Sequence, residues 1–297
     1  MDFRPHRRFN GVKTALLFGA LWALLLVVGM FVGSGRYLWA FAVAGVVLTI
    51  VPLWNCDKIA IRAMRAYPVT AQQQPTMHRI VSQLALEMRM PMPTLYVSPT
   101  PAPNAFATGR SPSRAAVCCT EGILDLLSER ELSGVLGHEL MHVRNRDILI
   151  SSVAAALAGV LTSLAYGLMW YGAGSRGRGR DQRAIGAFAS LTLIVLAPLA
   201  ATIIQLAISR TREYHADEDS ARATGDPLAL ANALAKLERG IDAAPLSGDP
   251  RLRNVSHLMI ANPFRGGALT RLFSTHPPTE QRVARLRTMA SGSATSR

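Results

Sequence analysis

The sequence predicts a mainly α-helical membrane protein, with two transmembrane hairpins and a polar α+β domain that contains a small sheet. Hydrophobic residues make up 49% of the 297 positions and charged residues only 17%, and the mean hydropathy is +0.21. Four segments without a charged residue are each long enough for the roughly 20-residue helix that crosses a bilayer. The polar stretches at 57–147 and 210–297 carry the periodicities of strands and amphipathic helices.

The first predicted hairpin occupies residues 1–56. Its two limbs hold 22 and 20 consecutive residues without Asp, Glu, Lys or Arg, and the sequence GSGR joins them. A cleaved signal peptide fits poorly, because the first apolar run is too long and a second follows at once. The arm before the hairpin is basic and its tip holds only Arg36, so the positive-inside rule predicts a cytoplasmic N-terminus.

The second predicted hairpin occupies residues 148–209. Its limbs contain 28 and 26 residues without a charge and are rich in Ala, Gly and Ser. A buried pair of core helices is the alternative, but length and lack of charge favour membrane insertion. The tip at 176–183 carries four arginines, which the charge rule places on the cytoplasmic side. The sequence therefore leaves open whether this hairpin crosses fully.

The polar stretches predict the following elements. The pair Ser128 and Glu131 has the spacing of a capping box, which marks the start of a helix. Strands are expected at 94–98, 104–109 and 115–120, and helices near 71–90, 121–127, 128–143, 226–239 and 279–290. A loop is expected at 241–254 and a disordered tail at 290–297.

Charge and cysteine content exclude some classes of protein. The formal net charge is +13, but much of it lies near apolar runs and no nucleic-acid-binding motif accompanies it. Anionic lipid headgroups are therefore the expected partner, and nucleic acid is not. Three cysteines without a regular spacing argue against both a disulfide framework and a cysteine-based zinc site. The adjacent Cys118 and Cys119 are expected to pack in a buried strand.

Residues 138–142 match the pattern H-E-x-x-H inside a predicted helix. His138 and His142 are four positions apart and share one helix face, so both imidazoles can bind one zinc ion while Glu139 reaches a water on it. A third ligand is still needed. The histidine that a metzincin places six residues further on is absent, since Ile148 occupies that position. Asp147 falls one position short and would point away on a continuing helix.

Glu213 and Asp217 are better candidates for the remaining ligand. They are four positions apart on a predicted helix that follows the second hairpin. One carboxylate can bind the metal while the other accepts the spare N–H of a ligand histidine. A solvated acidic helix face is the alternative. The hairpin favours a site, because its two ends bring His142 and Glu213 to the same side of the membrane.

Five segments in this order resemble the HtpX family of membrane zinc metalloproteases, which are relatives of the CAAX prenyl proteases. The segments are NAFATG, TEGILDLL, ELSGVLGHELMHVRNRD, SRTREYHADEDSA and FSTHPPTEQRVARL, and with the two hairpins they cover most of the chain. The resemblance implies a gluzincin-like catalytic domain formed by 57–147 and 210–297. It also implies one zinc ion per chain, bound by His138, His142 and Glu213.

Further roles follow for the expected reaction. Glu139 is the general base, and Asp217 is expected beside a ligand histidine. His276 is a candidate donor to the developing oxyanion, although a histidine in a Pro-rich turn can simply hold the loop; Tyr214 and His215 are alternatives. The segment Asn104, Ala105, Phe106 and Ala107 is the candidate substrate edge, where a peptide would add as a strand. An ordinary edge strand is the alternative.

The expected function is that of a membrane-integrated zinc endopeptidase in protein quality control. The resemblance implies a bacterial inner-membrane protein that cleaves misfolded or damaged membrane proteins on the cytoplasmic side during heat or envelope stress. A CAAX-type prenyl-protein processing protease is an alternative, and a non-catalytic zinc-binding membrane scaffold is another. The presence of Glu139 speaks against a scaffold, because a structural zinc site has no need of a base.

Overall fold

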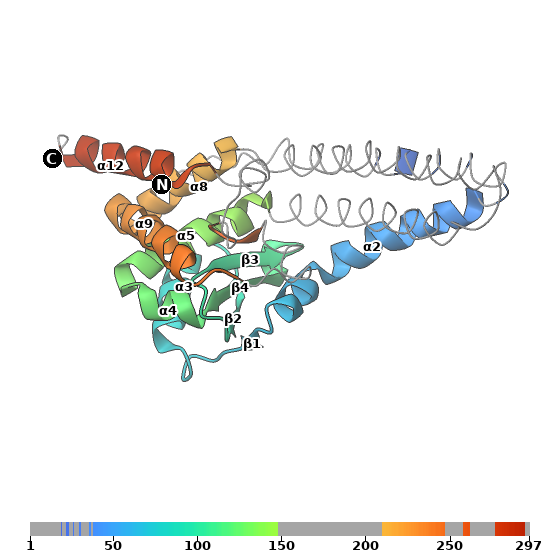
Figure 1. The fold of residues 1–297 in the computed structure, drawn as a ribbon, viewed down its shortest axis with the longest axis horizontal. Helices are drawn as coiled ribbons and strands as arrows, with labels where there is room; N and C mark the ends of the chain where they lie inside the picture. The colour runs from blue at the N-terminus through green and yellow to red at the C-terminus, as the bar shows by residue number, and fades with distance from the viewer. Residues whose placement is uncertain are drawn as a thin grey trace, which may run out of the picture.

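A four-stranded mixed sheet lies at the centre of the described residues, with the strand order β1–β2–β4–β3 (Figure 1). The computed structural model describes residues 38–147, 210–246, 258–261 and 277–294, together with isolated residues between 19 and 36. The strands are β1 (Tyr67–Pro68), β2 (Thr94–Ser98), β3 (Ala105–Gly109) and β4 (Ala115–Thr120). The helices are α2 (Leu38–Ala63), α3 (Pro75–Glu87), the 3-10 turn η2 (Pro112–Arg114), α4 (Glu121–Leu126), α5 (Glu129–Asn145), α8 (Arg210–Thr224), α9 (Pro227–Ala243) and α12 (Thr279–Ala294).

The alternation of side chains along the strands builds a core on each face of the sheet. β4 runs parallel to β2 and antiparallel to β3, which places β3 at an edge. Ala107 and Val117 belong to the large core that also contains α3, α5, α8 and α9. Phe106 and Cys118 point to the other face, where they pack with Met64, the residue that follows α2. Burial raises the pKa of both free thiols, Cys118 and Cys119, as expected for cysteines in a buried strand.

The helix that carries the H-E-x-x-H residues begins where the capping box predicts. The Ser128 hydroxyl accepts from the backbone N–H of Glu131, whose carboxylate in turn accepts from the backbone N–H of Ser128. Lys236 of α9 also contacts that carboxylate at 2.8 Å. The three predicted strands and the helices at α3, α4, α5, α9 and α12 are confirmed.

Two boundaries differ from the sequence-based expectation. α9 continues to Ala243, so the first three residues of the loop predicted at 241–254 belong to the helix. α12 continues to Ala294, so the prediction of a disordered tail from residue 290 is wrong over the first five positions. The exposed Ser291 hydroxyl donates to the carbonyl oxygens of Arg287 and Thr288, one turn earlier in the helix.

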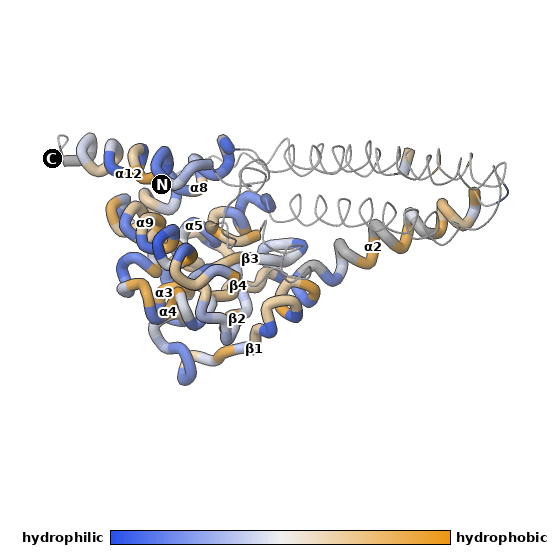
Figure 2. Tube along the Cα trace, viewed as in Figure 1, coloured by the Kyte–Doolittle hydropathy of each residue, from blue (hydrophilic) through white to orange (hydrophobic). Residues whose placement is uncertain are grey.

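α2 extends away from the sheet, and hydrophobic residues occur at many positions along it (Figure 2). Trp39 and Trp54 are 69% and 59% exposed, and several valines between them are also exposed. The helix is kinked at Asn55 and crosses the predicted domain boundary at 56–57. Among the described residues, no helix combines the length and apolar character needed to cross a bilayer. The second hairpin at 148–209 and most of the first lie outside the described residues.

Candidate metal centre

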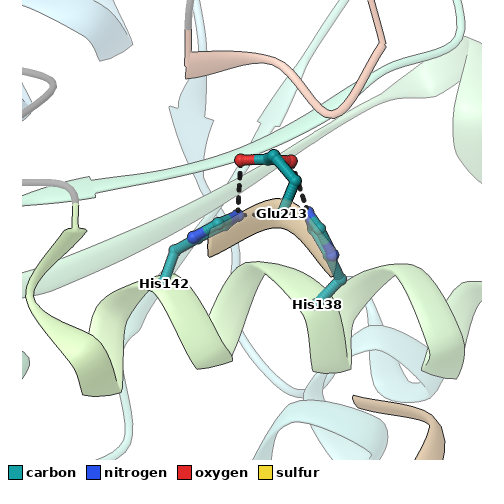
Figure 3. A group of neighbouring side chains, drawn as sticks. All are labelled: His138, His142 and Glu213. Atoms are coloured by element: carbon teal, nitrogen blue, oxygen red, sulfur yellow. Dashed lines mark hydrogen bonds and ion pairs between the residues drawn. The ribbon is translucent and has the colours of Figure 1, made fainter. Parts of the chain in front are cut away.

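Two histidines of α5 and one glutamate of α8 converge on a single point (Figure 3). The Nε2 atoms of His138 and His142 are 3.1 Å apart, and the rings are nearly perpendicular. One carboxylate oxygen of Glu213 lies 3.5 Å from Nε2 of His138, and the other lies 3.4 Å from Nε2 of His142. His138 and Glu213 are buried and His142 is nearly so, so the three groups form an interior polar cluster.

Close packing of α8 on α5 creates this convergence. A Cβ atom on Gly137 would lie 2.5 Å from the Ser220 hydroxyl, and a Cβ on Gly134 would lie 3.0 Å from the backbone of Leu230 in α9. Ser220 donates a 2.8 Å hydrogen bond to the carbonyl oxygen of Gly134. The two glycines thus allow the neighbouring helices to approach α5 closely. Glu213 lies two turns before Ser220 and is thereby brought over the histidines.

The donor set fits a divalent zinc ion. The three ligand atoms all lie within 4.8 Å of one another. Ligands about 2.0–2.1 Å from a tetrahedral zinc lie about 3.3 Å apart, which matches the separations of these nitrogen and oxygen atoms. Two imidazoles and one carboxylate are also a ligand combination of catalytic zinc sites, which keep the fourth position for water or substrate.

His138 is held on its other side by a buried ion pair. Its Nδ1 atom lies 2.9 Å from Oδ1 of Asp217, one turn after Glu213 on α8. Arg282 of α12 donates to both carboxylate oxygens of Asp217, from Nε at 2.8 Å and from Nη2 at 2.7 Å. Asp217 thus lies where the sequence placed it, next to a histidine of the cluster. Arg282 lies in the segment FSTHPPTEQRVARL that carries the resemblance, but no local spacing predicts its contact with Asp217, which is 65 positions away.

His142 also has a carboxylate partner, which was not predicted from the sequence. Its Nδ1 atom lies 3.2 Å from Oδ2 of Asp147, and Arg212 lies 3.4 Å from the other oxygen of that carboxylate. Asp147 does not continue the helix, because α5 ends at Asn145 and Arg146 adopts a left-handed conformation with φ of 58°. That turn folds Asp147 back toward the last helical turn. The expectation that Asp147 points away applied to a continuing helix, and α5 does not continue to Asp147.

Glu139 faces the edge strand β3. Its Oε2 atom accepts a 2.9 Å hydrogen bond from the backbone N–H of Ala107. The side chain is 2% exposed and lies beside His138 on the same helix. The predicted base and the predicted substrate edge are therefore in direct contact.

The other half of the predicted substrate edge contacts the chain itself. The backbone N–H of Ile260 donates to the carbonyl oxygen of Ala105 at 3.0 Å, and Met259 pairs with Phe106 in an antiparallel bridge. The side-chain amide of Asn104 donates to the carbonyl oxygen of Ala261 at 3.0 Å. Residues 258–261, here called the edge segment, thus lie along β3 and pair with it through a single antiparallel bridge.

The three candidate donors to an oxyanion are His276, Tyr214 and His215, and the structure describes two of them. His276 lies outside the described residues. Tyr214 donates to the side chain of Gln281 at 2.9 Å, and the guanidinium of Arg285 stacks on its ring. His215 is not part of the metal cluster, as its position two residues after Glu213 predicts.

Nearby carboxylates raise the pKa of both histidines above the ordinary value. Burial and the charge of Arg282 lower the pKa of His138, but hydrogen bonds to Asp217 and Glu213 outweigh them and raise it to about 9. Burial also opposes the charged form of His142, but the negative charge of Glu213 prevails and raises its pKa. Burial raises the pKa of Asp217, and Arg282 more than compensates, so it is about 2.

The H-E-x-x-H helix, the carboxylate from a second helix and the neighbouring edge strand together define a metallopeptidase. The model of peptidase family M48 matches residues 71–290, and the chain belongs to this family. Its similarity extends to proteins named Protease HtpX homolog. The one from Kineococcus radiotolerans is 60% identical over 290 residues, and the one from Pseudarthrobacter chlorophenolicus is 58% identical over 289. Each alignment covers 96% of this chain and 98% of the relative.

Among solved structures, the crystal structure of S. mikatae Ste24p matches 94% of this chain and 65% of its own. The TM-score is 0.49 and the sequence identity is 16%.

Proposed function

We propose that this metallopeptidase is a zinc-dependent endopeptidase, with zinc bound by His138, His142 and Glu213. The observation that carries the proposal is the convergence of three ligand atoms within 4.8 Å beside a buried glutamate that contacts a strand edge. Domain limits at 1–56, 57–147, 148–209 and 210–297 belong to the same proposal. In it, 57–147 and 210–297 together form the catalytic domain, and the other two are membrane hairpins.

The chemistry needs a Lewis acid and a base. Zinc at this site would supply the Lewis acid, which polarises the scissile carbonyl and lowers the pKa of a water molecule. Glu139 accepts the proton of the attacking water and delivers it to the leaving amine. The N–H of Ala107 keeps the Glu139 carboxylate in place at the sheet edge. Asp217 and Asp147 fix the orientation of the two imidazoles, each through its Nδ1 atom.

Substrate peptide would bind along β3. An extended peptide adds to an exposed sheet edge through backbone hydrogen bonds, which select extended shape more than sequence. Ala107 lies at the middle of β3, next to Glu139, so a peptide on this edge runs past the base. Asn104, Ala105 and Phe106 belong to the same proposed edge, but they are bonded to residues 259–261, so the part left for a peptide begins at Ala107. His276 is proposed as the donor to the developing oxyanion.

The physiological substrates in this proposal are misfolded or damaged membrane proteins, cleaved on the cytoplasmic side of a bacterial inner membrane. Two features support it: the charge-free segments of the sequence and the near full-length similarity to proteins named Protease HtpX homolog. A response to heat or envelope stress completes the proposed role.

The test uses the full chain purified in detergent with a chelator present. Zinc is then added to the parent and to Glu139→Gln, and cleavage of an unfolded model protein and of the chain itself is followed. We expect cleavage by the parent only, with zinc bound equally by both. Zinc binding without cleavage by either protein would instead favour a scaffold. A prenylated peptide cleaved in preference to the unfolded protein would favour the processing protease.

A further inference from the structure

Arg282 is the largest fully buried side chain of the described residues. It is 2% exposed and lies in the first turn of α12, beyond the residues that the proposed mechanism uses. Burying an unpaired guanidinium costs several kcal/mol, so a buried arginine persists only with partners that satisfy its N–H groups. The identity of those partners indicates what this side chain does.

The guanidinium contacts three separate parts of the chain. Its Nε and Nη2 atoms form a two-pronged pair with the carboxylate of Asp217 on α8. Nη2 also lies 3.4 Å from the ring nitrogens of His138 on α5. Nη1 donates at 3.2 Å to the carbonyl oxygen of Ile260, in the edge segment. One planar group therefore joins the candidate metal centre to the segment that lies on β3.

The contact with Ile260 connects the guanidinium to the proposed peptide-binding edge. The N–H of Ile260 bonds to Ala105, whereas its carbonyl oxygen bonds to Arg282. The edge segment is thus held between β3 on one side and Arg282 on the other. Because the guanidinium is a planar and rigid fork, its hydrogen bonds to Asp217 set the direction of its hydrogen bond to Ile260. The ammonium group of a lysine is a point charge and cannot relate the two contacts in this way.

We propose that Arg282 is a positioning residue that couples the orientation of His138, through Asp217, to the seating of the edge segment on β3. This inference rests on the proposed function, since it assigns significance to the metal centre and to the peptide edge. It makes the edge segment a boundary of the binding strand: while Arg282 holds it, a peptide pairs beyond Phe106, on the side of Ala107. Loss of the fork frees the edge segment and loosens His138 together.

The first measurement is metal binding, which needs no cleavage. Zinc and cobalt affinities are determined by competition with a chelator for the parent, Arg282→Lys and the control Arg287→Ala, an exposed arginine of the same helix. Loss of an outer partner of a metal ligand typically costs about 10–100-fold in affinity. We expect a loss in that range for Arg282→Lys, with an altered cobalt absorption spectrum, and no change for Arg287→Ala. An unchanged affinity in Arg282→Lys would overturn the proposal.

The second measurement is hydrogen exchange of the backbone amides at 258–261. The proposal expects faster exchange in Arg282→Lys than in the parent or in Arg287→Ala, because the edge segment has lost its bond to the guanidinium. If metal binding weakened while exchange stayed the same, Arg282 would orient only His138, and the proposed coupling to the edge segment would be wrong. Neither measurement depends on peptide cleavage. If the chain cleaved nothing, the proposed function would be wrong, but the role of Arg282 could still be tested.

A variant of Asp217, the partner of Arg282, provides a second test in case Arg282→Lys does not fold. Asp217→Asn keeps the size of the side chain but removes the charge that the fork binds. We expect it to raise exchange at 258–261, although it does not touch that segment. The double variant should lose little more metal affinity than either single one, as residues that act as a unit are non-additive. Unchanged exchange in Asp217→Asn would contradict the coupling on its own.

Discussion

The ring of His142 lies 3.2 Å from the carboxylate of Asp147, although residues five positions apart point to different sides of a continuous helix. The left-handed residue Arg146 makes the contact possible, because it ends α5 and turns Asp147 toward His142. A residue other than glycine in this conformation costs of order 1 kcal/mol, and such strain tends to occur at functional sites. Each histidine of the cluster thus has a carboxylate partner of its own.

Removal of the Asp147 side chain should weaken metal binding without preventing folding. In Asp147→Ala the Nδ1 atom of His142 loses its acceptor, and we expect about 10–100-fold lower zinc affinity by chelator competition. The matched control is Asp125→Ala, which removes an exposed carboxylate from α4. Equal affinities of the two variants would show that Asp147 does not orient His142.

Two substitutions at Glu139 should separate its chemical role from its structural one. Glu139→Gln keeps an oxygen that accepts from the N–H of Ala107, so its stability should match the parent while cleavage falls by about 10²–10⁴-fold. Glu139→Ala leaves that buried N–H unpaired and should cost a further 1–3 kcal/mol or so of unfolding free energy. Denaturant unfolding in detergent, alongside the cleavage assay, measures both. Residual full activity in Glu139→Gln would exclude it as the base.

The approach of α8 to α5 should be sensitive to a single methyl group. Gly137→Ala places a Cβ against the Ser220 hydroxyl, and we expect about 1–3 kcal/mol of destabilisation with weaker zinc binding, because Glu213 moves with α8. The double variant Gly137→Ala with Ser220→Ala removes the clashing oxygen and should recover part of both losses. Gly292→Ala, where a Cβ meets nothing within 4 Å, is the control. If the double variant recovered neither stability nor zinc binding, the steric clash of Gly137→Ala would not be with the Ser220 hydroxyl.

Metal uptake should depend on pH in a defined direction. Zinc needs neutral imidazoles, whereas the metal-free protein holds His138 with a pKa of about 9 and His142 with a raised pKa. Below about pH 9 binding therefore displaces protons, so affinity should fall as the pH falls. The raised pKa of His138 also stabilises the metal-free fold fully below its unfolded value of about 6.5, and this contribution is lost as the pH rises through 9.

Calorimetric titration with zinc in buffers of different ionisation enthalpy measures the protons released. The expectation is net proton release at neutral pH and an affinity that climbs toward pH 9. An affinity that does not change with pH would mean that the histidines are already neutral in the metal-free protein.

Local spacing was enough to predict much of the candidate centre. His138 and His142 share a helix face because four positions nearly complete one turn, and the same spacing relates Glu213 to Asp217. The capping box at Ser128 and Glu131 is likewise a local signal and lies where predicted. Asp147 was expected to point away only if the helix continued, and no glycine near Arg146 predicts the left-handed turn that ends it. No local spacing predicted the contacts of Arg282, because they join segments that are distant in the chain.

By itself, the sequence determined which residue types stand at helical spacing and therefore which side chains can act together from one helix. Only the tertiary structure decided which helices meet, and two glycines of α5 permit that approach by leaving no Cβ in the way. It also decided that the edge segment pairs with β3 and that Arg282 joins it to Asp217. The pair of Arg282 and Asp217 forms because the packed helices bury both charges away from water, where each needs a partner. That is a property of the whole arrangement, which no short window of sequence contains.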